Sequence, residues 1–324
     1  MLFRDGQDAA FPTEETWTVN APSHQPPQIA RTNGIDICYE IFGDANADPM
    51  LLIMGLGAQM IHWDDEFCVN LAARGFRVIR FDNRDIGKSS HLTGGKRLTP
   101  FELLKLRFLK IPVDAPYRLI DMARDTVGLM DHLGIKSAHL VGASMGGMIA
   151  QEIAISFPQR LRSLTSIMST TGNPKVPPPP RAAAKLLMRP TPRRKEEFLA
   201  RFTQTWKLLR VGKFPLDEAR DLMRAERIFA RGLHYEGSAR QLRAILASGS
   251  RKKRLHAVAA PTLVIHGTVD PLVHPFGGKD TAASIPGAKL MMVNGMGHAL
   301  PVEMWPEVIE AIAAHAHGAA KKAA

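Results

Sequence analysis

The sequence is poor in cysteine and lacks long apolar runs, and each absence excludes a class of protein. Its 324 residues include two cysteines, Cys38 and Cys68, which are too few for a disulfide framework and show no metal-ligand spacing. No apolar stretch is long enough to cross a bilayer. Residues 1–27 are polar and contain several prolines, without the apolar centre of a secretory signal. We therefore expect a soluble, reduced protein of the cytoplasm.

Positive charge dominates the ionic balance of the chain. The formal net charge is +11, and residues 181–213 hold ten Lys and Arg against two Glu. Such an excess suggests either binding to nucleic acid or a basic face exposed to water. The chain has neither a zinc-finger spacing nor an aromatic RNA-binding signature. We favour the solvated face and expect no nucleic-acid partner, while a homo-oligomer stays open.

Short apolar runs alternate with amphipathic stretches, and this alternation of strand and helix predicts a parallel sheet. Asn33-Gly34 predicts a hairpin, because both residues tolerate the positive φ angles of a tight turn. Thr99, Pro100 and Glu102 carry the marks of a helix start. Further strands are expected at 50–54, 76–81, 137–141, 161–168, 262–266 and 289–293, and helices at about 61–74, 119–133, 275–284 and 302–316.

Residues 170–255 interrupt the alternation of strands and helices. They contain four consecutive prolines at 177–180 and helical stretches, but no strand-like run. Proline fixes φ and donates no backbone hydrogen bond, so this run predicts a stiff entry into an inserted unit. We therefore expect a helical cap at 170–255 on a core domain formed by 28–169 and 256–318. The flanking segments are predicted to be an N-terminal arm at 1–27 and a C-terminal tail at 319–324.

A G-x-S-x-G motif centred on Ser144 lies between the apolar run 137–141 and an apolar helical stretch. A strand that turns directly into a helix strains its central residue, and glycines on either side relieve the crowding. The alternative is a serine that only caps a helix. The flanking strand and helix favour a nucleophile elbow, with Ser144 as the nucleophile.

Candidates for an acid and a base follow two later strands. Asp270 comes after the strand at 262–266, and His298 comes after the strand at 289–293. Because ligands bind at the carboxyl ends of parallel strands, both residues are expected near Ser144. The order Ser144, Asp270, His298 suits a catalytic triad, although Asp270 could be a turn residue before Pro271 and His298 a surface histidine. We predict that His298 is the base and that Asp270 orients it.

The loop after the strand at 50–54 supplies the remaining catalytic candidates. Gly55-Leu56-Gly57 allows close backbone approach, so the N–H groups of Leu56 and Met145 are the predicted oxyanion donors. His62 and Trp63 follow this loop and are expected to line the pocket entrance.

Three other residues are predicted to have structural roles. We expect Asp82 and Arg84 to join loops beneath the site through charge-assisted hydrogen bonds. Cys68 is expected to pack in the core.

Together these motifs resemble the α/β-hydrolase fold family. The resemblance lies in Gly142-x-Ser144-x-Gly146, Asp82-x-Arg84-x-x-Gly87-x-Ser89, Gly267-x-x-Asp270 and Gly297-His298. It implies a mostly parallel eight-stranded sheet flanked by helices, with the cap inserted after strand 6. The sequences around 81–85 and 295–301 are similar to the aclacinomycin methylesterase subgroup, which implies ester hydrolysis with no cofactor or metal. Met54 departs from the family pattern, because histidine is common there.

The main hypothesis is a serine carboxylic-ester hydrolase that forms an acyl-enzyme on small to medium apolar esters. A serine nucleophile disfavours haloalkane dehalogenase and epoxide hydrolase chemistry, which needs a carboxylate at that position. A lactonase, a thioesterase or another acyl hydrolase would use the same triad. A small-molecule-binding protein of hydrolase fold without turnover is the alternative from a different class.

Overall fold

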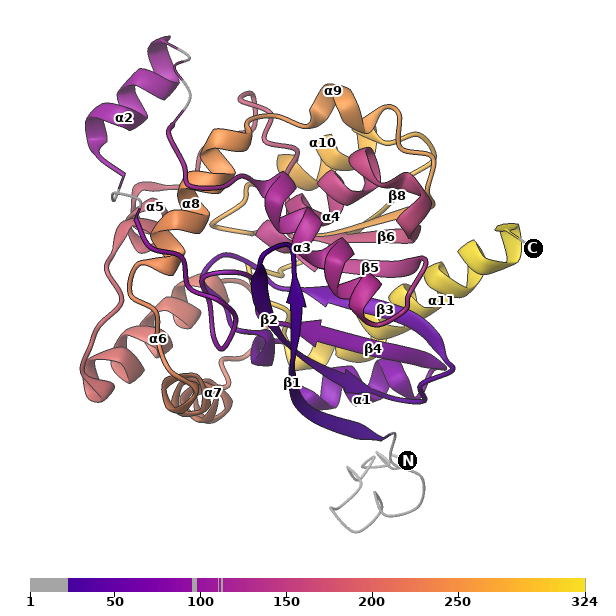
Figure 1. Cartoon of the computed structure of the whole chain (residues 1–324). Coiled ribbons are helices and arrows are strands. Elements are labelled where there is room, and N and C mark those ends of the chain that lie inside the picture. The colour runs from indigo at the N-terminus through magenta and orange to yellow at the C-terminus, as the bar shows by residue number, and fades with distance from the viewer. Residues whose placement is uncertain (1–22, 95–97, 110, 112, 324) are drawn as a thin grey trace, which may run out of the picture.

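The computed structural model describes residues 23–94, 98–109, 111 and 113–323. One eight-stranded sheet crosses the centre of the molecule, in the order β1-β2-β4-β3-β5-β6-β7-β8 (Figure 1). The pairs β1–β2 and β2–β4 are antiparallel, and the other neighbours are parallel. The strands are β1 (His24–Thr32), β2 (Ile35–Phe42), β3 (Asp48–Ile53), β4 (Phe76–Phe81), β5 (Ala138–Ala143), β6 (Leu161–Ile167), β7 (Thr262–Gly267) and β8 (Lys289–Val293). This sheet confirms the predicted fold class.

The N-terminal hairpin is confirmed, but the first strand begins earlier than the sequence indicates. Asn33 and Gly34 have φ angles of 49° and 76°, as the tight turn requires. The predicted arm at 1–27 is wrong for residues 24–27, which belong to β1, and residues 1–22 lie outside the described part. The pairing register shifts between Gln25 and Gln28. Two prolines fit in this interval because β1 is an edge strand and contains a local irregularity.

Helices cover both faces of the sheet, and alternate residues of its central strands point into two cores. On β3, Leu51 and Ile53 pack with residues of α3 and α4, whereas Met50 and Leu52 pack with residues of α1 and α11. These layers explain why 50–54 reads as a continuous apolar run. The helices outside the cap are α1 (Asp65–Ala72), α2 (Pro100–Leu104), α3 (Leu119–His132), α4 (Met145–Ser156), α10 (Phe276–Ser284) and α11 (Trp305–Ala323).

Three helix predictions can be compared in detail with the structure. The helix expected at 61–74 is divided into a 3-10 turn, η2 (Met60–His62), and α1. The helix start at Thr99 is confirmed, because Thr99 and Glu102 form a reciprocal capping box. Residues 105–109 continue α2 as a π-helical turn. The predicted tail at 319–324 differs from the structure, in which α11 continues to Ala323, and Ala324 lies outside the described residues.

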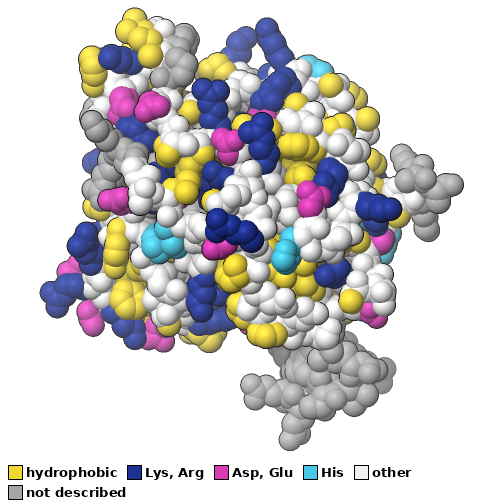
Figure 2. Space-filling model, viewed as in Figure 1, with side chains coloured by type: hydrophobic (Ala, Val, Ile, Leu, Met, Phe, Trp, Pro, Cys, Tyr) yellow, Lys and Arg dark blue, Asp and Glu magenta, His cyan; other side chains and the backbone are white. Residues whose placement is uncertain are grey.

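The cap, residues 170–255, lies between β6 and β7. Its helices are α5 (Arg181–Met188), α6 (Lys195–Leu209), α7 (Glu218–Arg231), α8 (Gly237–Ser248) and α9 (Lys252–Leu255). Among the described residues, no helix is both long and apolar enough to span a membrane. On the face seen in Figure 2, Lys and Arg side chains lie among acidic and apolar ones, without one continuous basic stripe.

Ion pairs join the cap to the core domain. Three arginines of α7 face three consecutive acidic residues at the start of α1, in the pairs Arg224–Asp64, Arg227–Asp65 and Arg220–Glu66. Deeper in the molecule, Arg240 of α8 forms a pair with Asp85, and both side chains are almost completely buried. Exposed pairs stabilise a protein weakly, whereas breaking a buried one is costly. Removing one partner of the Arg240–Asp85 pair should therefore destabilise the docked cap more than removing one partner of an exposed pair such as Arg227–Asp65.

Candidate active site

Ser144 lies at the sharp turn between β5 and α4. Its φ and ψ angles are 54° and −116°, a conformation that side-chain-bearing residues rarely adopt. A Cβ atom at Gly142 would overlap the backbone of Gly146, and one at Gly146 would overlap the carbonyl of Ile53. The glycines therefore allow the start of α4 to lie directly against β3 and β5. This arrangement leaves the Ser144 hydroxyl at the carboxyl edge of the sheet.

His298 joins Ser144 to Asp270 by two hydrogen bonds. The distance from Ser144 Oγ to His298 Nε2 is 3.1 Å, and that from His298 Nδ1 to Asp270 Oδ2 is 2.7 Å. A carboxylate only accepts hydrogen bonds, so the imidazole proton lies on Nδ1 and the Nε2 lone pair faces the serine hydroxyl. The structure therefore brings together the three residues predicted as nucleophile, base and acid, in the geometry of a proton relay.

Asp270 is held in its ionised form. Its Oδ1 accepts hydrogen bonds from the backbone N–H groups of Leu272 and Val273, each at 2.8 Å. Burial alone would raise the pKa of the Asp270 carboxyl, but the charge of His298 and hydrogen bonds from His266 and His298 outweigh it. The pKa therefore lies well below its ordinary value. An ionised carboxylate is the form that stabilises an imidazolium on His298.

His266 is a partner of Asp270 that the sequence reasoning missed. It is completely buried in β7, and its Nε2 lies 2.9 Å from the carbonyl oxygen of Val273 and 3.4 Å from Asp270 Oδ2. Since the Val273 carbonyl only accepts, the His266 proton lies on Nε2 and points towards both oxygens. The available signal was a polar residue inside the apolar strand β7, four residues before Asp270.

The loop after β3 lies against the nucleophile. A Cβ atom at Gly55 would lie 3.2 Å from the Cβ of Ser144, so only a glycine leaves full clearance there. Leu56 and Ser144 both line the same cavity, whereas the Met145 side chain is completely buried. Met145 begins α4, so its backbone N–H has no acceptor within that helix. Both predicted oxyanion donors are thus in segments next to the Ser144 hydroxyl.

Two polar side chains hold this loop in place, and the sequence reasoning identified neither. Asn83 Nδ2 donates to the Met54 carbonyl at 2.9 Å. Gln241, a completely buried residue of α8, accepts from the Gly57 N–H at 2.8 Å and donates to the Arg84 carbonyl at 2.9 Å. The cap therefore contributes directly to the position of the loop that contains Leu56.

A cavity of about 330 Å³ opens onto Ser144 and His298. His62 and Trp63, the residues predicted near the pocket entrance, line it together with Leu56. Aromatic side chains form much of the remaining wall, namely Phe67, Phe198, Phe202, Trp206 and Trp305. Four arginines also line the cavity, namely Arg189, Arg201, Arg210 and Arg224, but most of its wall is apolar. A space of this size suits a mainly apolar ligand of modest dimensions.

Comparisons with known proteins assign the fold family. Residues 48–303 match the alpha/beta hydrolase fold family. The chain belongs to this family. The rhodomycin D methylesterase DnrP of Streptomyces peucetius is 30% identical over 315 residues, covering 91% of this chain and 99% of that protein. DauP, the rhodomycin D methylesterase of Streptomyces sp. strain C5, is 29% identical with the same coverage. The resemblance inferred from the motifs is confirmed.

Solved structures of other hydrolases share the architecture. The enol-lactonase of Burkholderia xenovorans LB400 matches with a TM-score of 0.68 at 23% identity, covering 89% of this chain and 99% of that one. A meta-cleavage product hydrolase of Pseudomonas fluorescens IP01 matches with a TM-score of 0.70 at 18% identity, covering 90% and 98%. At this level of identity, these likenesses establish the fold and leave the substrate open.

The residues predicted to support the hydrolase site structurally do so. Asp82 accepts the Met60 N–H at 2.7 Å, which ties the segment after the Leu56 loop to β4. Arg84 forms a bidentate ion pair with Asp125 of α3, in which Nε and Nη2 each lie 2.6 Å from a carboxylate oxygen. Cys68 is completely buried, and burial raises the pKa of its thiol to about 12, so it is a packing residue.

Proposed function

We propose that this chain is a serine carboxylic-ester hydrolase that acts through an acyl-enzyme intermediate. The observation that carries the proposal is the hydrogen-bonded sequence Ser144–His298–Asp270 at the mouth of an apolar cavity. The two methylesterase relatives, which align over nearly their whole length, support ester hydrolysis in particular. The cap at 170–255 and the core at 28–169 and 256–318 are proposed to act as one catalytic unit.

In the first half-reaction, Ser144 Oγ attacks the ester carbonyl while His298 Nε2 takes the hydroxyl proton. Asp270 keeps the proton of the neutral imidazole on Nδ1 and stabilises the imidazolium that forms. The backbone N–H groups of Leu56 and Met145 would stabilise the negative charge that develops on the carbonyl oxygen. His298 then returns its proton to the leaving alcohol, and the acyl group stays on Ser144.

In the second half-reaction, water replaces the alcohol. His298 takes a proton from this water, which attacks the acyl carbon, and the same oxyanion donors stabilise the second tetrahedral intermediate. Collapse of that intermediate releases the carboxylic acid and returns the proton to Ser144. Every proton moves between Ser144, His298, the leaving alcohol and water, so the proposed reaction requires no cofactor.

The test is hydrolysis of p-nitrophenyl esters by the wild type and by Ser144→Ala. Loss of the nucleophile should reduce kcat by about 10⁴-fold or more, because the triad acts as a unit. Ser137→Ala is the matched control, since Ser137 lies outside the site and bonds to Arg162. Turnover that persists in Ser144→Ala, or a wild type without turnover on any ester, would refute the proposal.

The apolar, aromatic-walled cavity supports small to medium apolar esters as the substrate class. A series of acyl-length esters that includes a lactone, a thioester and an amide would define the preferred bond. We expect the highest kcat/KM on an uncharged ester. A lactone or thioester preferred by about tenfold or more would assign the same triad to that chemistry instead.

A further inference from the structure

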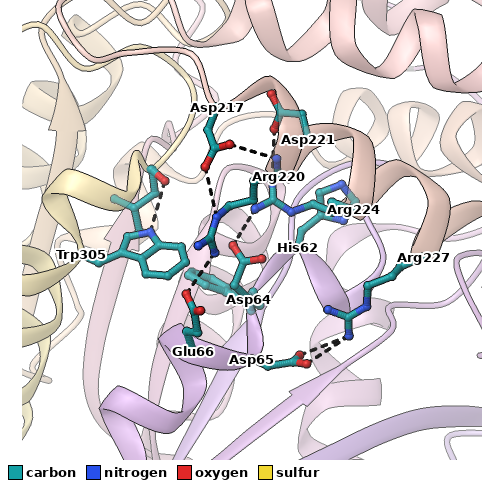
Figure 3. A network of polar contacts seen from close by, with 12 residues as sticks. His62, Asp64, Asp65, Glu66, Asp217, Arg220, Asp221, Arg224, Arg227 and Trp305 are labelled. Atoms are coloured by element: carbon teal, nitrogen blue, oxygen red, sulfur yellow. Dashed lines mark hydrogen bonds and ion pairs between the residues drawn. The ribbon is translucent and has the colours of Figure 1, made fainter. Parts of the chain in front are cut away.

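His62 is a polar group on the cavity wall with a fixed position. It ends the 3-10 turn η2 and lines the cavity with Ser144. Two cap residues pack around its ring, with centroid distances of 5.9 Å to Phe202 and 5.8 Å to Trp206. Figure 3 shows His62 next to Arg224, within the group of ion pairs that joins α7 to the start of α1.

The position of the single ring proton of His62 follows from its one hydrogen bond. Nδ1 lies 2.9 Å from the carbonyl oxygen of Gln59, which only accepts, so Nδ1 carries the proton. The Gln59 side chain is itself held by the carbonyl of Gly232 at 2.8 Å and by Arg231 Nε at 2.8 Å. Nε2 therefore carries a lone pair, and no protein donor in the described part of the chain reaches it.

The surroundings of His62 keep its ring neutral. Burial is the largest influence, and the positive charge of Arg224 acts in the same direction, so the pKa of His62 falls to about 3 despite the opposing Gln59 hydrogen bond. Arg224 is fixed there by Asp64 at 2.6 Å and by Asp221 at 3.5 Å. A ring with so low a pKa is a poor proton acceptor in catalysis but still accepts a hydrogen bond. His62 is therefore suited to accept a hydrogen bond, whereas His298 is proposed to transfer protons.

We propose that His62 Nε2 is a substrate-binding acceptor that selects esters bearing a hydroxyl group. The inference rests on the proposed ester hydrolysis and adds a substrate class, namely apolar esters with an alcohol or phenol hydroxyl away from the reacting carbonyl. The aromatic wall would bind the apolar body, and the His62 Nε2 lone pair would accept a hydrogen bond from the hydroxyl group. Asp64 also lines the cavity, but its carboxylate is paired with Arg224, whereas His62 Nε2 has no such partner among the described residues. A ligand that supplies a donor to Nε2 is therefore favoured, because an unmatched buried polar group weakens binding.

The experiment compares matched pairs of methyl esters that differ by one remote hydroxyl, such as methyl 3-(4-hydroxyphenyl)propanoate and methyl 3-phenylpropanoate. The series varies the linker length and the ring position of the hydroxyl, and kcat/KM is measured for each member. His62→Phe keeps an aromatic ring and removes the lone pair. His256→Phe is the matched control, because His256 is exposed.

In at least one pair, the wild type and His256→Phe should prefer the hydroxylated ester by about tenfold, the effect of one well-placed hydrogen bond. His62→Phe should bring this ratio to about one, because it lowers kcat/KM on the hydroxylated ester more than on its deoxy partner. Because His62 stays neutral, the preference should be constant between about pH 5 and pH 8. A merely structural role would lower both rates together and leave the ratio unchanged.

Two results would overturn the inference: ratios near one for the wild type in every pair, or a preference that survives in His62→Phe. A wild type inactive on all esters would refute the proposed function instead. In that case, calorimetric binding of 4-ethylphenol and ethylbenzene to the Ser144→Ala protein still tests the acceptor. The site is supported if the Ser144→Ala protein binds 4-ethylphenol more tightly than ethylbenzene and the further substitution His62→Phe removes this difference. Equal binding of the two compounds to the Ser144→Ala protein refutes it.

Discussion

Replacing Gln241 with leucine should impair both stability and catalysis, although Gln241 lies in the cap. Its side chain joins the Gly57 N–H to the Arg84 carbonyl, with distances of 2.8 Å and 2.9 Å, and it is completely buried. Leucine has a similar size but offers neither a donor nor an acceptor. The substitution therefore leaves the buried Arg84 carbonyl without a partner, opens the Gly57 N–H to water and loosens the segment that presents the Leu56 N–H.

The structure sets the magnitude of both effects. A buried backbone group left unpaired costs about 1–3 kcal/mol, and of the two groups only the Arg84 carbonyl is buried, so Gln241→Leu should lower the free energy of unfolding by about 1–3 kcal/mol. Complete loss of one oxyanion donor reduces kcat by about 10²- to 10³-fold. The Leu56 N–H is displaced and not removed, so we expect a reduction in kcat of about 10- to 100-fold.

Ser89→Ala is the control that separates the two effects. Ser89 is also buried and also joins two backbone groups, because Oγ accepts from the Cys38 N–H at 2.9 Å and donates to the Asp82 carbonyl at 2.6 Å. Its loss should cost at least as much free energy of unfolding as the loss of Gln241, without disturbing residues 55–57. Denaturant unfolding and steady-state kinetics on a p-nitrophenyl ester measure both variants. Equal kcat in Gln241→Leu and Ser89→Ala would show that Gln241 does not position the loop that contains Leu56.

Two further residues give predictions, namely Asp270 of the triad and Gly146 in the sharp turn at Ser144. Asp270→Asn should reduce kcat by about 10³- to 10⁴-fold with little change in KM, because an amide can also bind the wrong imidazole tautomer; an unchanged kcat would exclude Asp270 as the orienting acid. Because the pKa of Asp270 is lower in the folded protein, its contribution to stability is complete above about pH 4, the range of an unfolded aspartate, and is lost as the pH falls further. In urea unfolding between pH 6 and pH 2, the free energy of unfolding should fall less steeply with decreasing pH in Asp270→Asn than in the wild type. Gly146→Ala should lower the free energy of unfolding by about 3 kcal/mol or more, since its Cβ would overlap the Ile53 carbonyl; a melting temperature within about 2 °C of the wild type would contradict that geometry.

The sequence was sufficient to predict which segments meet at the site. Ser144, Asp270 and His298 each follow an apolar strand, and parallel strands end at one edge of the sheet, so chain order alone predicts their proximity. The Asn33-Gly34 hairpin and the Thr99 capping box could be predicted for a similar reason. Their hydrogen bonds close within a few residues and depend little on the rest of the fold.

Features that depend on how the cap docks could not be predicted. Gln241 is separated from Gly57 by 184 residues, and nothing in the local pattern of α8 distinguishes it from a solvent-exposed glutamine. The arginines of α7 and the acidic residues at the start of α1 that they pair with are also far apart in the chain. Arg224 and Asp64, for example, are separated by 160 positions. The start of β1 was missed for another reason, since prolines usually argue against a strand and pairing with β2 outweighs them at the edge.

The central claim is that Ser144 carries the acyl group, and trapping that intermediate tests it most directly. The wild type would be mixed rapidly with a p-nitrophenyl ester, quenched in acid, and analysed by peptide mass spectrometry. We expect a burst of p-nitrophenol and one acyl adduct on the peptide containing Ser144, both absent from Ser144→Ala. A burst with the adduct on another residue, or turnover by Ser144→Ala, would contradict it.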